Sequence, residues 1–296
     1  MIVIMGASGN TGGVAAGKLL EAGEKVRVIG RDASRLEKLT SRGAKAFVAD
    51  ATDAAALAKA FEGAEAVYVM NPPNISAPDV PAYQVQVSDA VTAAITKAKV
   101  PKAVLLSSVG ADKPEKTGPV TGLHRFENKL STIAGLDAVY LRAGYFMENL
   151  LAQAGVIKKL GMLAGPLRAD LPLPMIATRD IGAAVADLLL KRDFTGKQAR
   201  ELLGQRDVSY AEMAPIIGEA IGKPGLKYTK PPAMMLRMAL SQIGMSGSMA
   251  NLLLEMADSL NSGYMVPLES RSASNTTPTS IETFVAEEFV PRFKVA

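Results

Sequence analysis

The sequence predicts an α/β protein with a doubly wound parallel sheet. Short apolar runs alternate with helical patterns over the first half of the chain. Most of these runs are unbroken rather than alternating, as expected of strands that are buried on both faces of a parallel sheet. Each run is followed by a segment of helix length. This alternation is typical of βαβ units with right-handed crossovers.

The elements follow in order along the chain. We expect strands at 2–5, 25–30, 44–50, 64–71, 102–110 and 137–142. Helices are expected between them at 14–23, 34–43, 54–63 and 83–100, and the first three of these end at glycines. A further amphipathic helix at 178–190 is expected to pack back on the sheet.

Composition excludes several classes of protein. The 296 residues include no cysteine and one histidine, which excludes disulfides, thiol nucleophiles and thiolate or histidine-rich metal sites. The net charge is only +4 and no block of Lys or Arg occurs, so no nucleic-acid partner is expected. No apolar run is long enough to span a bilayer and no signal peptide is visible. We therefore expect a cytoplasmic protein without a membrane partner.

A glycine-rich loop follows the first strand and opens the first helix, with the spacing G-x-x-G-x-x-G. Gly6 would make the tight turn, Gly9 would let a pyrophosphate approach the backbone, and Gly12 would let the helix pack on the sheet. The free N–H groups and the dipole of the helix then favour phosphate, with Ser8, Asn10 and Thr11 as additional donors. The alternative is a purely structural turn.

The end of the second strand bears on the choice of nicotinamide cofactor. Gly30 leaves room and Arg31 offers a planar donor for a 2′-phosphate, which favours NADP(H) over NAD(H). Asp32 is the competing signal, because it could bind a ribose hydroxyl or simply cap the next helix. Further cofactor contacts are expected where the third and fourth strands end, at Asp50, Ala51, Asn71 and Pro72.

Several segments together resemble the NmrA-like branch of the atypical short-chain dehydrogenase/reductases. They are the glycine loop, Arg31, VAD at 48–50, SSVGAD at 107–112, HRFENKL at 124–130, LRAGYFMENLL at 141–151, and the stretch 201–224. That family includes NADPH-dependent quinone oxidoreductases and NADP-sensing regulators. The resemblance implies an NAD(P)-binding Rossmann fold with a smaller C-terminal substrate lobe. We assign 1–155 to the dinucleotide-binding domain and most of 156–296 to the second lobe.

The usual catalytic pair of short-chain enzymes is absent, because no tyrosine is followed by a lysine four residues later. Lys129 occupies the lysine position, either reaching the nicotinamide ribose or lying in solvent, and Arg125 precedes it. His124, Ser107 (with its neighbour Ser108) and Tyr145 are the other candidate catalytic residues. Their alternatives are a solvated histidine and a core tyrosine.

Two functions remain open at this stage. The first is hydride transfer from NADPH to a quinone or a small hydrophobic carbonyl, since a hydroquinone anion needs no dedicated proton donor. The second is a non-catalytic NADP(H) sensor. Ten of the 14 methionines lie between Met162 and Met265, either as core filling or as a deformable wall for a hydrophobic substrate. A homodimer is the one protein partner considered.

Overall fold

A parallel sheet of seven strands forms the centre of the larger lobe in the computed structural model, which describes residues 1–296. The strand order is β10-β6-β5-β4-β1-β2-β3, and every neighbouring pair is parallel. The strands are β1 (Ile2–Ile4), β2 (Val26–Gly30), β3 (Lys45–Val48), β4 (Ala66–Val69), β5 (Lys102–Ser108), β6 (Asp137–Ala143) and β10 (Lys197–Leu202). The predicted doubly wound sheet is confirmed.

Strand β10 was not predicted from the sequence. Its residues, KQAREL, include two cations and an acid, and the first four lie at or near the surface. It pairs only with β6, at one end of the sheet. An edge strand of this kind needs no unbroken apolar run, so the criterion that found the buried strands does not apply to it.

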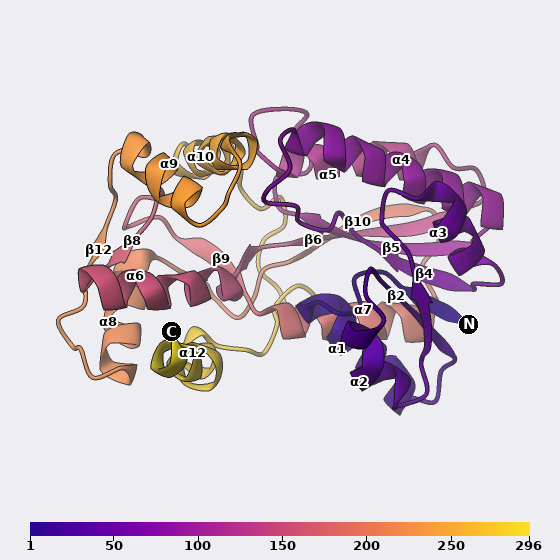
Figure 1. Ribbon diagram of the computed structural model, residues 1–296, viewed down its shortest axis with the longest axis horizontal. Helices are drawn as coiled ribbons and strands as arrows, with labels where there is room; N and C mark the ends of the chain where they lie inside the picture. Colours follow the sequence, from indigo (N-terminus) through magenta and orange to yellow (C-terminus); the bar gives the residue numbers. More distant parts are fainter.

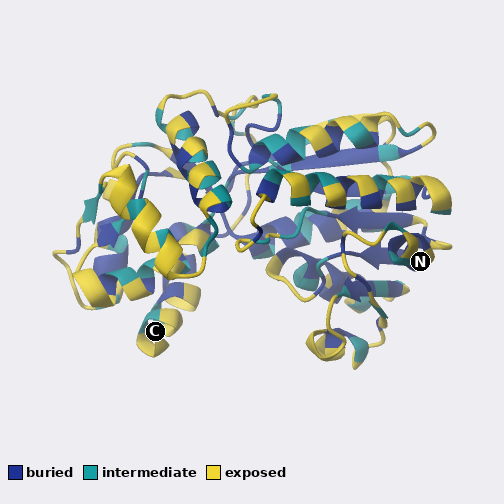
Figure 2. Ribbon diagram, turned by 45° about the horizontal axis from the view of Figure 1, so that its top comes forward, coloured by how far each residue is buried: buried dark blue, intermediate teal, exposed yellow.

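Helices cover both faces of the sheet (Figure 1). One face carries α3 (Ala54–Phe61), α4 (Val80–Ala98) and α5 (Val120–Ser131). The other carries α1 (Asn10–Glu21) and α7 (Thr178–Lys191), with the short η1 (Ser34–Leu36) and α2 (Glu37–Thr40) beside them. Figure 2 shows the inner strands of this sheet as mostly buried between the helical layers.

Helices α1 and α7 approach closely because Gly182 lies at their contact. A Cβ atom on Gly182 would lie only 2.7 Å from the carbonyl oxygen of Thr11. Ile181, Val185 and Leu189 of α7 join the hydrophobic core on this face of the sheet. The helix expected at 178–190 therefore packs on the sheet beside the first helix, although it comes from the second half of the chain.

The smaller lobe contains short strands and the remaining helices (Figure 1). Its core includes Met147, Leu173, Met213, Ile217 and Phe284. The strands are β7 (Tyr145–Phe146), β8 (Leu163–Ala164), β9 (Leu173–Ile176), β11 (Asp207–Val208) and β12 (Tyr228–Thr229). The helices are η2 (Met147–Ala152), α6 (Gln153–Leu160), α8 (Tyr210–Ala220), α9 (Ala233–Gln242), α10 (Gly247–Asn261), α11 (Ile281–Phe284), η3 (Val285–Phe289) and α12 (Val290–Val295).

A segment after α10 ties the smaller lobe back to the larger one. The buried carboxylate of Glu201, on β10, accepts hydrogen bonds from the backbone N–H groups of Leu268 (3.0 Å) and Glu269 (2.8 Å). Asp180, on α7, accepts two more from the N–H and hydroxyl of Thr279. These bonds satisfy two buried carboxylates and fix how the segment crosses the sheet edge. No helix is both long and apolar enough to cross a bilayer.

Candidate active site

The glycine loop adopts the conformation that its spacing predicts. Gly6 has a positive φ of +62°, a left-handed conformation that glycine tolerates best. A Cβ on Gly12 would lie 2.6 Å from the carbonyl oxygen of Gly6, so only glycine permits this packing of helix on strand. Ser8, Gly9 and Asn10 are exposed at the start of α1. The first amides of α1 therefore face outward, where an anion can reach them.

Thr11 differs from its neighbours in this loop. Its hydroxyl is buried and lies 2.8 Å from the hydroxyl of Tyr68, on β4. That bond anchors the start of α1 to the sheet. The Thr11 side chain is thereby turned away from the phosphate position that the sequence suggested for it.

The end of β2 resolves the ambiguity at Asp32. One carboxylate oxygen accepts hydrogen bonds from the N–H (2.9 Å) and the hydroxyl (2.8 Å) of Ser34, and these bonds lower the pKa of Asp32. Asp32 therefore closes the turn into η1. Arg31 is exposed and makes no hydrogen bond or ion pair. Its guanidinium remains available to a ligand.

Arg31 lies near the residues that follow β3. Asp50 accepts hydrogen bonds from the N–H and hydroxyl of Thr52, which lower its pKa, and the nearby Arg31 charge lowers it further. The next residue, Ala51, is buried. The three cofactor candidates Arg31, Asp50 and Ala51 thus come together at one end of the carboxyl edge of the sheet.

Asn71 follows β4 at the same edge. Its amide nitrogen and oxygen are both buried, and neither has a hydrogen-bond partner within the protein. Buried amides are nearly always paired, so both ends of this side chain are available to a ligand. Pro72 continues from it into the proline-rich loop and is partly exposed.

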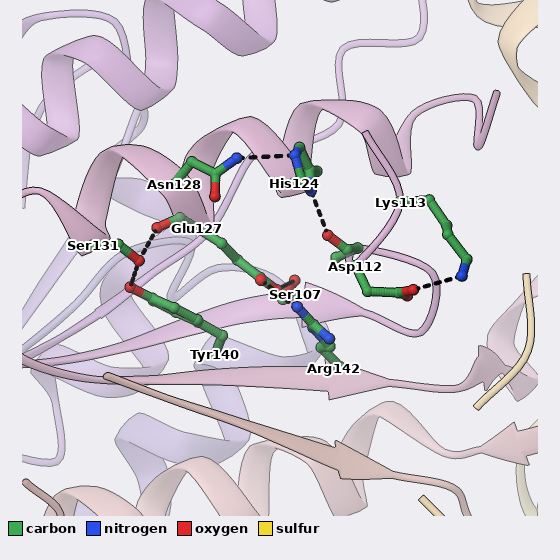
Figure 3. A network of polar contacts seen from close by, with 10 residues as sticks. Ser107, Asp112, Lys113, His124, Glu127, Asn128, Ser131, Tyr140 and Arg142 are labelled. Carbon is green, nitrogen blue, oxygen red and sulfur yellow. Dashed lines mark hydrogen bonds and ion pairs between the residues drawn. The ribbon is translucent and has the colours of Figure 1, made fainter. Parts of the chain in front are cut away.

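Ser107, at the end of β5, belongs to a buried ionic network (Figure 3). Its hydroxyl donates to Oε1 of Glu127 on α5, at 2.5 Å. Glu127 also accepts two bonds from the Arg142 guanidinium on β6, at 3.0 and 2.6 Å. This pairing with Glu127 raises the pKa of Arg142. Since the Ser107 proton is directed at a buried carboxylate, this structure does not offer it to a substrate.

The next residue, Ser108, lines a cavity instead, and its hydroxyl donates to the carbonyl of Val109 at 3.0 Å. The cavity has a volume of about 310 Å³ and lies between the carboxyl ends of β5 and β6 and the smaller lobe. Its polar side chains are Ser108, Tyr145 and Asn149. The rest of its lining is mainly apolar and comes largely from three segments, Leu171–Pro174, Met256 with Leu260, and Met265–Pro267.

Tyr145 lies beside two other tyrosines, Tyr210 and Tyr228. Burial raises the pKa of Tyr145, and its neighbours Tyr210 and Asn149 offset part of that rise. Tyr210 stacks on Tyr228 with ring centroids 4.4 Å apart. A tyrosine with a raised pKa stays protonated at neutral pH and can donate a hydrogen bond into the cavity.

Lys129 and His124 point elsewhere. The Lys129 ammonium donates to Ser88 at 3.0 Å and pairs with Asp89, both on α4. His124 is held between the carbonyl of Ala111 (2.8 Å) and the amide of Asn128 (2.9 Å), and Figure 3 shows the contact with Asn128. Neither residue lines the cavity. The structure thus brings Tyr145 to the cavity, but not Lys129, His124 or Ser107.

Residues 1–289 match the NmrA-like family over nearly the whole chain. The chain belongs to the NmrA-like family. Among curated relatives, an NAD(P)H azoreductase of Xenophilus azovorans is 30% identical over 258 residues, which are 86% of each chain. Quinone oxidoreductase 2 of Escherichia coli is 25% identical over 86% of this chain and 85% of its own.

Solved structures agree with the family assignment at the level of the fold. An NADPH-dependent quinone oxidoreductase of Escherichia coli, crystallised with NADPH, superposes with a TM-score of 0.77 at 23% identity, covering 98% of this chain and all of the other. A triphenylmethane reductase of Citrobacter, complexed with NADP(H), gives 0.75 at 18% identity over 99% and 100%. These likenesses confirm the doubly wound fold.

Sequence reasoning missed part of the site in this NmrA-like protein. Glu127 was recognisable only as a charge at the margin of an apolar helical stripe, and Arg142 as a charge in a buried strand. Asn149 carried no signal, since its place in the cavity depends on η2. An acid beside the apolar stripe of a helix and a base within a strand could have suggested an ion pair.

Proposed function

We propose that this NAD(P)H-dependent oxidoreductase transfers a hydride from NADPH to a quinone, an azo compound or a similar conjugated acceptor held in the cavity. The cavity carries the proposal, because it joins the carboxyl ends of β5 and β6 to an apolar wall. In doubly wound folds, ligands bind outside the carboxyl ends of the strands. NADPH, when bound, supplies the hydride.

The carboxyl edge fits a dinucleotide with a 2′-phosphate. The amides at the start of α1 would hold the pyrophosphate, and the Arg31 guanidinium would bind the 2′-phosphate. The orphaned amide of Asn71 would bind the nicotinamide half of the cofactor. Ser8 and Asn10 would supply further donors, whereas Thr11 would contribute its backbone alone.

The lining of the cavity supports a flat, apolar acceptor. Leu173, Met256 and Met265 offer apolar contact, and methionine adapts to rings of different shape. Few polar groups interrupt this surface, so the site orients an acceptor by Tyr145, Asn149 and Ser108. The expectation that the methionine-rich half forms a deformable wall is therefore retained for Met256 and Met265.

The missing tyrosine–lysine pair fits an acceptor that tolerates negative charge. Because its pKa is raised, Tyr145 stays protonated and would donate a hydrogen bond to the oxygen or nitrogen on which charge develops. A hydroquinone anion formed this way can take its proton from solvent. Simple ketones, whose alkoxide products need a strong proton donor, would be poor substrates.

The proposal is tested by following NADPH oxidation with a panel of quinones, azo compounds and simple ketones. We expect turnover with the first two classes, and Tyr145→Phe should lower kcat about tenfold, the size of one hydrogen bond in the transition state. Tyr140→Phe is the matched control, because the hydroxyl of Tyr140 bonds Ser131 on the helical face, away from the cavity. Turnover limited to simple ketones would contradict the proposal.

The sensor function has a separate outcome in the same experiment. A protein that binds NADPH in calorimetry, but that does not oxidise NADPH with any acceptor of the panel, would be a binding protein and no enzyme. Such a sensor would need different affinities for NADPH and NADP⁺, since a ligand with equal affinity for two states shifts no population.

A further inference from the structure

An exposed apolar surface lies on the smaller lobe, away from the cavity lining. Helix α9 has no buried residue (Figures 1 and 2). Met234, Met235, Met238 and the following Ile243 are between 58% and 72% exposed. Monomeric proteins rarely leave a group of large apolar side chains of this kind uncovered without a function.

The two sides of α9 are both apolar. Leu236 and Leu240, four residues apart, are the partly buried side chains of the helix and lie on its inner side against α10. Met234 and Met238 have the same spacing and lie on the opposite side. A surface helix normally turns a polar face to solvent, so the exposed methionines on the outer side of α9 are expected to have a partner.

The apolar surface continues onto the loop after β4. Ser246, just beyond α9, donates its backbone N–H to the carbonyl of Ile75 at 2.9 Å. Ile75 is itself 45% exposed. We call the group Met234, Met235, Met238, Ile243 and Ile75 the α9 patch. It extends from the smaller lobe to the loop that follows Asn71.

The chain around α9 is basic and carries no acid, with Lys230 three residues before the helix and Arg237 on it. Between Glu219 and Glu255 the chain has four cations and no Asp or Glu. The four side chains are exposed, and none forms an ion pair. They are Lys223, Lys227, Lys230 and Arg237. The net charge of the whole chain is only +4, so this segment is strongly basic by comparison.

We infer that the α9 patch is a contact surface for an anionic lipid bilayer, on which the protein rests without crossing it. An apolar helix flanked by cations is the arrangement that binds at the headgroup level of a membrane. Flexible methionines suit a fluid surface. This departs from the expectation of no membrane partner, which considered only spanning segments and signal peptides.

A second copy of the chain fits the same surface less well. In an antiparallel two-fold contact centred on α9, Arg237 lies near the middle of the helix and would come close to Arg237 of the other copy. Like charges at such short range disfavour association. Anionic headgroups complement these cations instead.

The position of the α9 patch relates the bilayer contact to the cavity. Helix α10 follows α9 directly and supplies Met256 and Leu260 to the cavity lining. A bilayer beneath α9 would therefore lie next to the helix that lines the cavity, and apolar quinones partition into bilayers. This last link rests on the proposed function, whereas the bilayer contact does not.

The inference is tested by co-sedimentation of the full chain with vesicles. Vesicles of phosphatidylcholine mixed with phosphatidylglycerol should bind the protein, and vesicles of phosphatidylcholine alone should not. High salt should release it. Arg237→Gln should weaken binding about fivefold, because one basic residue near an anionic surface contributes about 1 kcal/mol.

A matched pair of variants separates the patch from general effects of charge. Met238→Glu, on the outer side of α9, should lower vesicle binding at least about tenfold, since it loses apolar insertion and adds repulsion. Val295→Glu places the same charge on another exposed apolar residue and should bind nearly as the wild type does. Circular dichroism and NADPH binding should be unchanged in both, because neither side chain is buried.

Three outcomes would overturn the inference. They are no binding to anionic vesicles, equal loss of binding in both variants, and a dimer in sedimentation equilibrium that Met238→Glu dissociates. The last would assign the patch to a second copy. Co-sedimentation with vesicles does not depend on turnover, so a negative result would leave the proposed reduction of quinones unaffected.

Discussion

The hydroxyl of Ser107 donates a 2.5 Å hydrogen bond to the carboxylate of Glu127, which the Arg142 guanidinium holds from the other side. The three residues come from β5, α5 and β6, so one carboxylate connects two neighbouring strands and the helix above them. Both members of the ion pair are nearly inaccessible to solvent. The network therefore has a structural role beside the cavity.

Removing Glu127 should be costly. Glu127→Ala leaves the Arg142 charge buried without its partner, and loss of one member of a buried pair destabilises by about 3–5 kcal/mol. Urea denaturation measures the free energy of unfolding. The double variant Glu127→Leu/Arg142→Met removes both charges and should regain most of the loss. A single variant as stable as the wild type would disprove the role of the pair.

Arg31 should decide between the two nicotinamide cofactors. Arg31→Ala should lower NADPH affinity about tenfold to a hundredfold, since a hydrogen bond to a charged group is worth about 1.5–3 kcal/mol. NADH affinity should hardly change, because NADH has no 2′-phosphate for Arg31 to bind. Calorimetry gives both dissociation constants. Lys38→Ala, on the exposed side of α2, is the control for loss of a surface cation.

Substitutions at two glycines of the glycine-rich loop after β1 should separate the effect on packing from the effect on ligand binding. Gly12→Ala forces a Cβ to within 2.6 Å of the Gly6 carbonyl oxygen, and overpacking of this kind typically costs about 1–3 kcal/mol. In Gly9→Ala the new Cβ lies 3.3 Å from the Gly6 carbonyl oxygen, which a shift of a few tenths of an ångström relieves, so the loss of stability should be smaller. This variant should still bind NADPH at least about tenfold more weakly, because its methyl group blocks the pyrophosphate. Equal affinity in Gly9→Ala and the wild type would argue against the phosphate site.

The stability of the fold should depend on pH through Glu148. Burial raises the pKa of its carboxyl, although Thr178 donates two hydrogen bonds to Oε1, and Oε2 has no partner. A pKa that is higher in the folded state gives stability that is complete below the unfolded value and is lost as pH rises through the folded value. The folded state should therefore lose stability as the pH rises above the ordinary range of a glutamate.

Glu148→Gln removes that dependence while keeping an oxygen for Thr178. Its free energy of unfolding should equal that of the wild type in acid and exceed it at neutral pH. Chemical denaturation across this range measures the difference between the two proteins. The same comparison with Glu287→Gln, an exposed carboxylate paired with Arg179, controls for loss of a charge. A parallel pair of curves for Glu148→Gln and the wild type would remove Glu148 as the cause.

The sequence by itself determined six of the seven strands of the sheet, the turn at Gly6 and the position of Arg31 at the end of β2. Each depends on local rules, since apolar runs, glycine conformations and strand ends act over a few neighbouring residues. Where several residues could bond to the same partner, the local sequence pattern does not determine which of them does so. The tertiary structure turned Ser107 toward Glu127 and left Ser108 to the cavity. It also bound Lys129 to α4, bonded Asp32 to Ser34 in a turn, and added β10 at the edge. These outcomes depend on how each helix is rotated about its axis and which distant charge it meets, and packing of the whole chain fixes both.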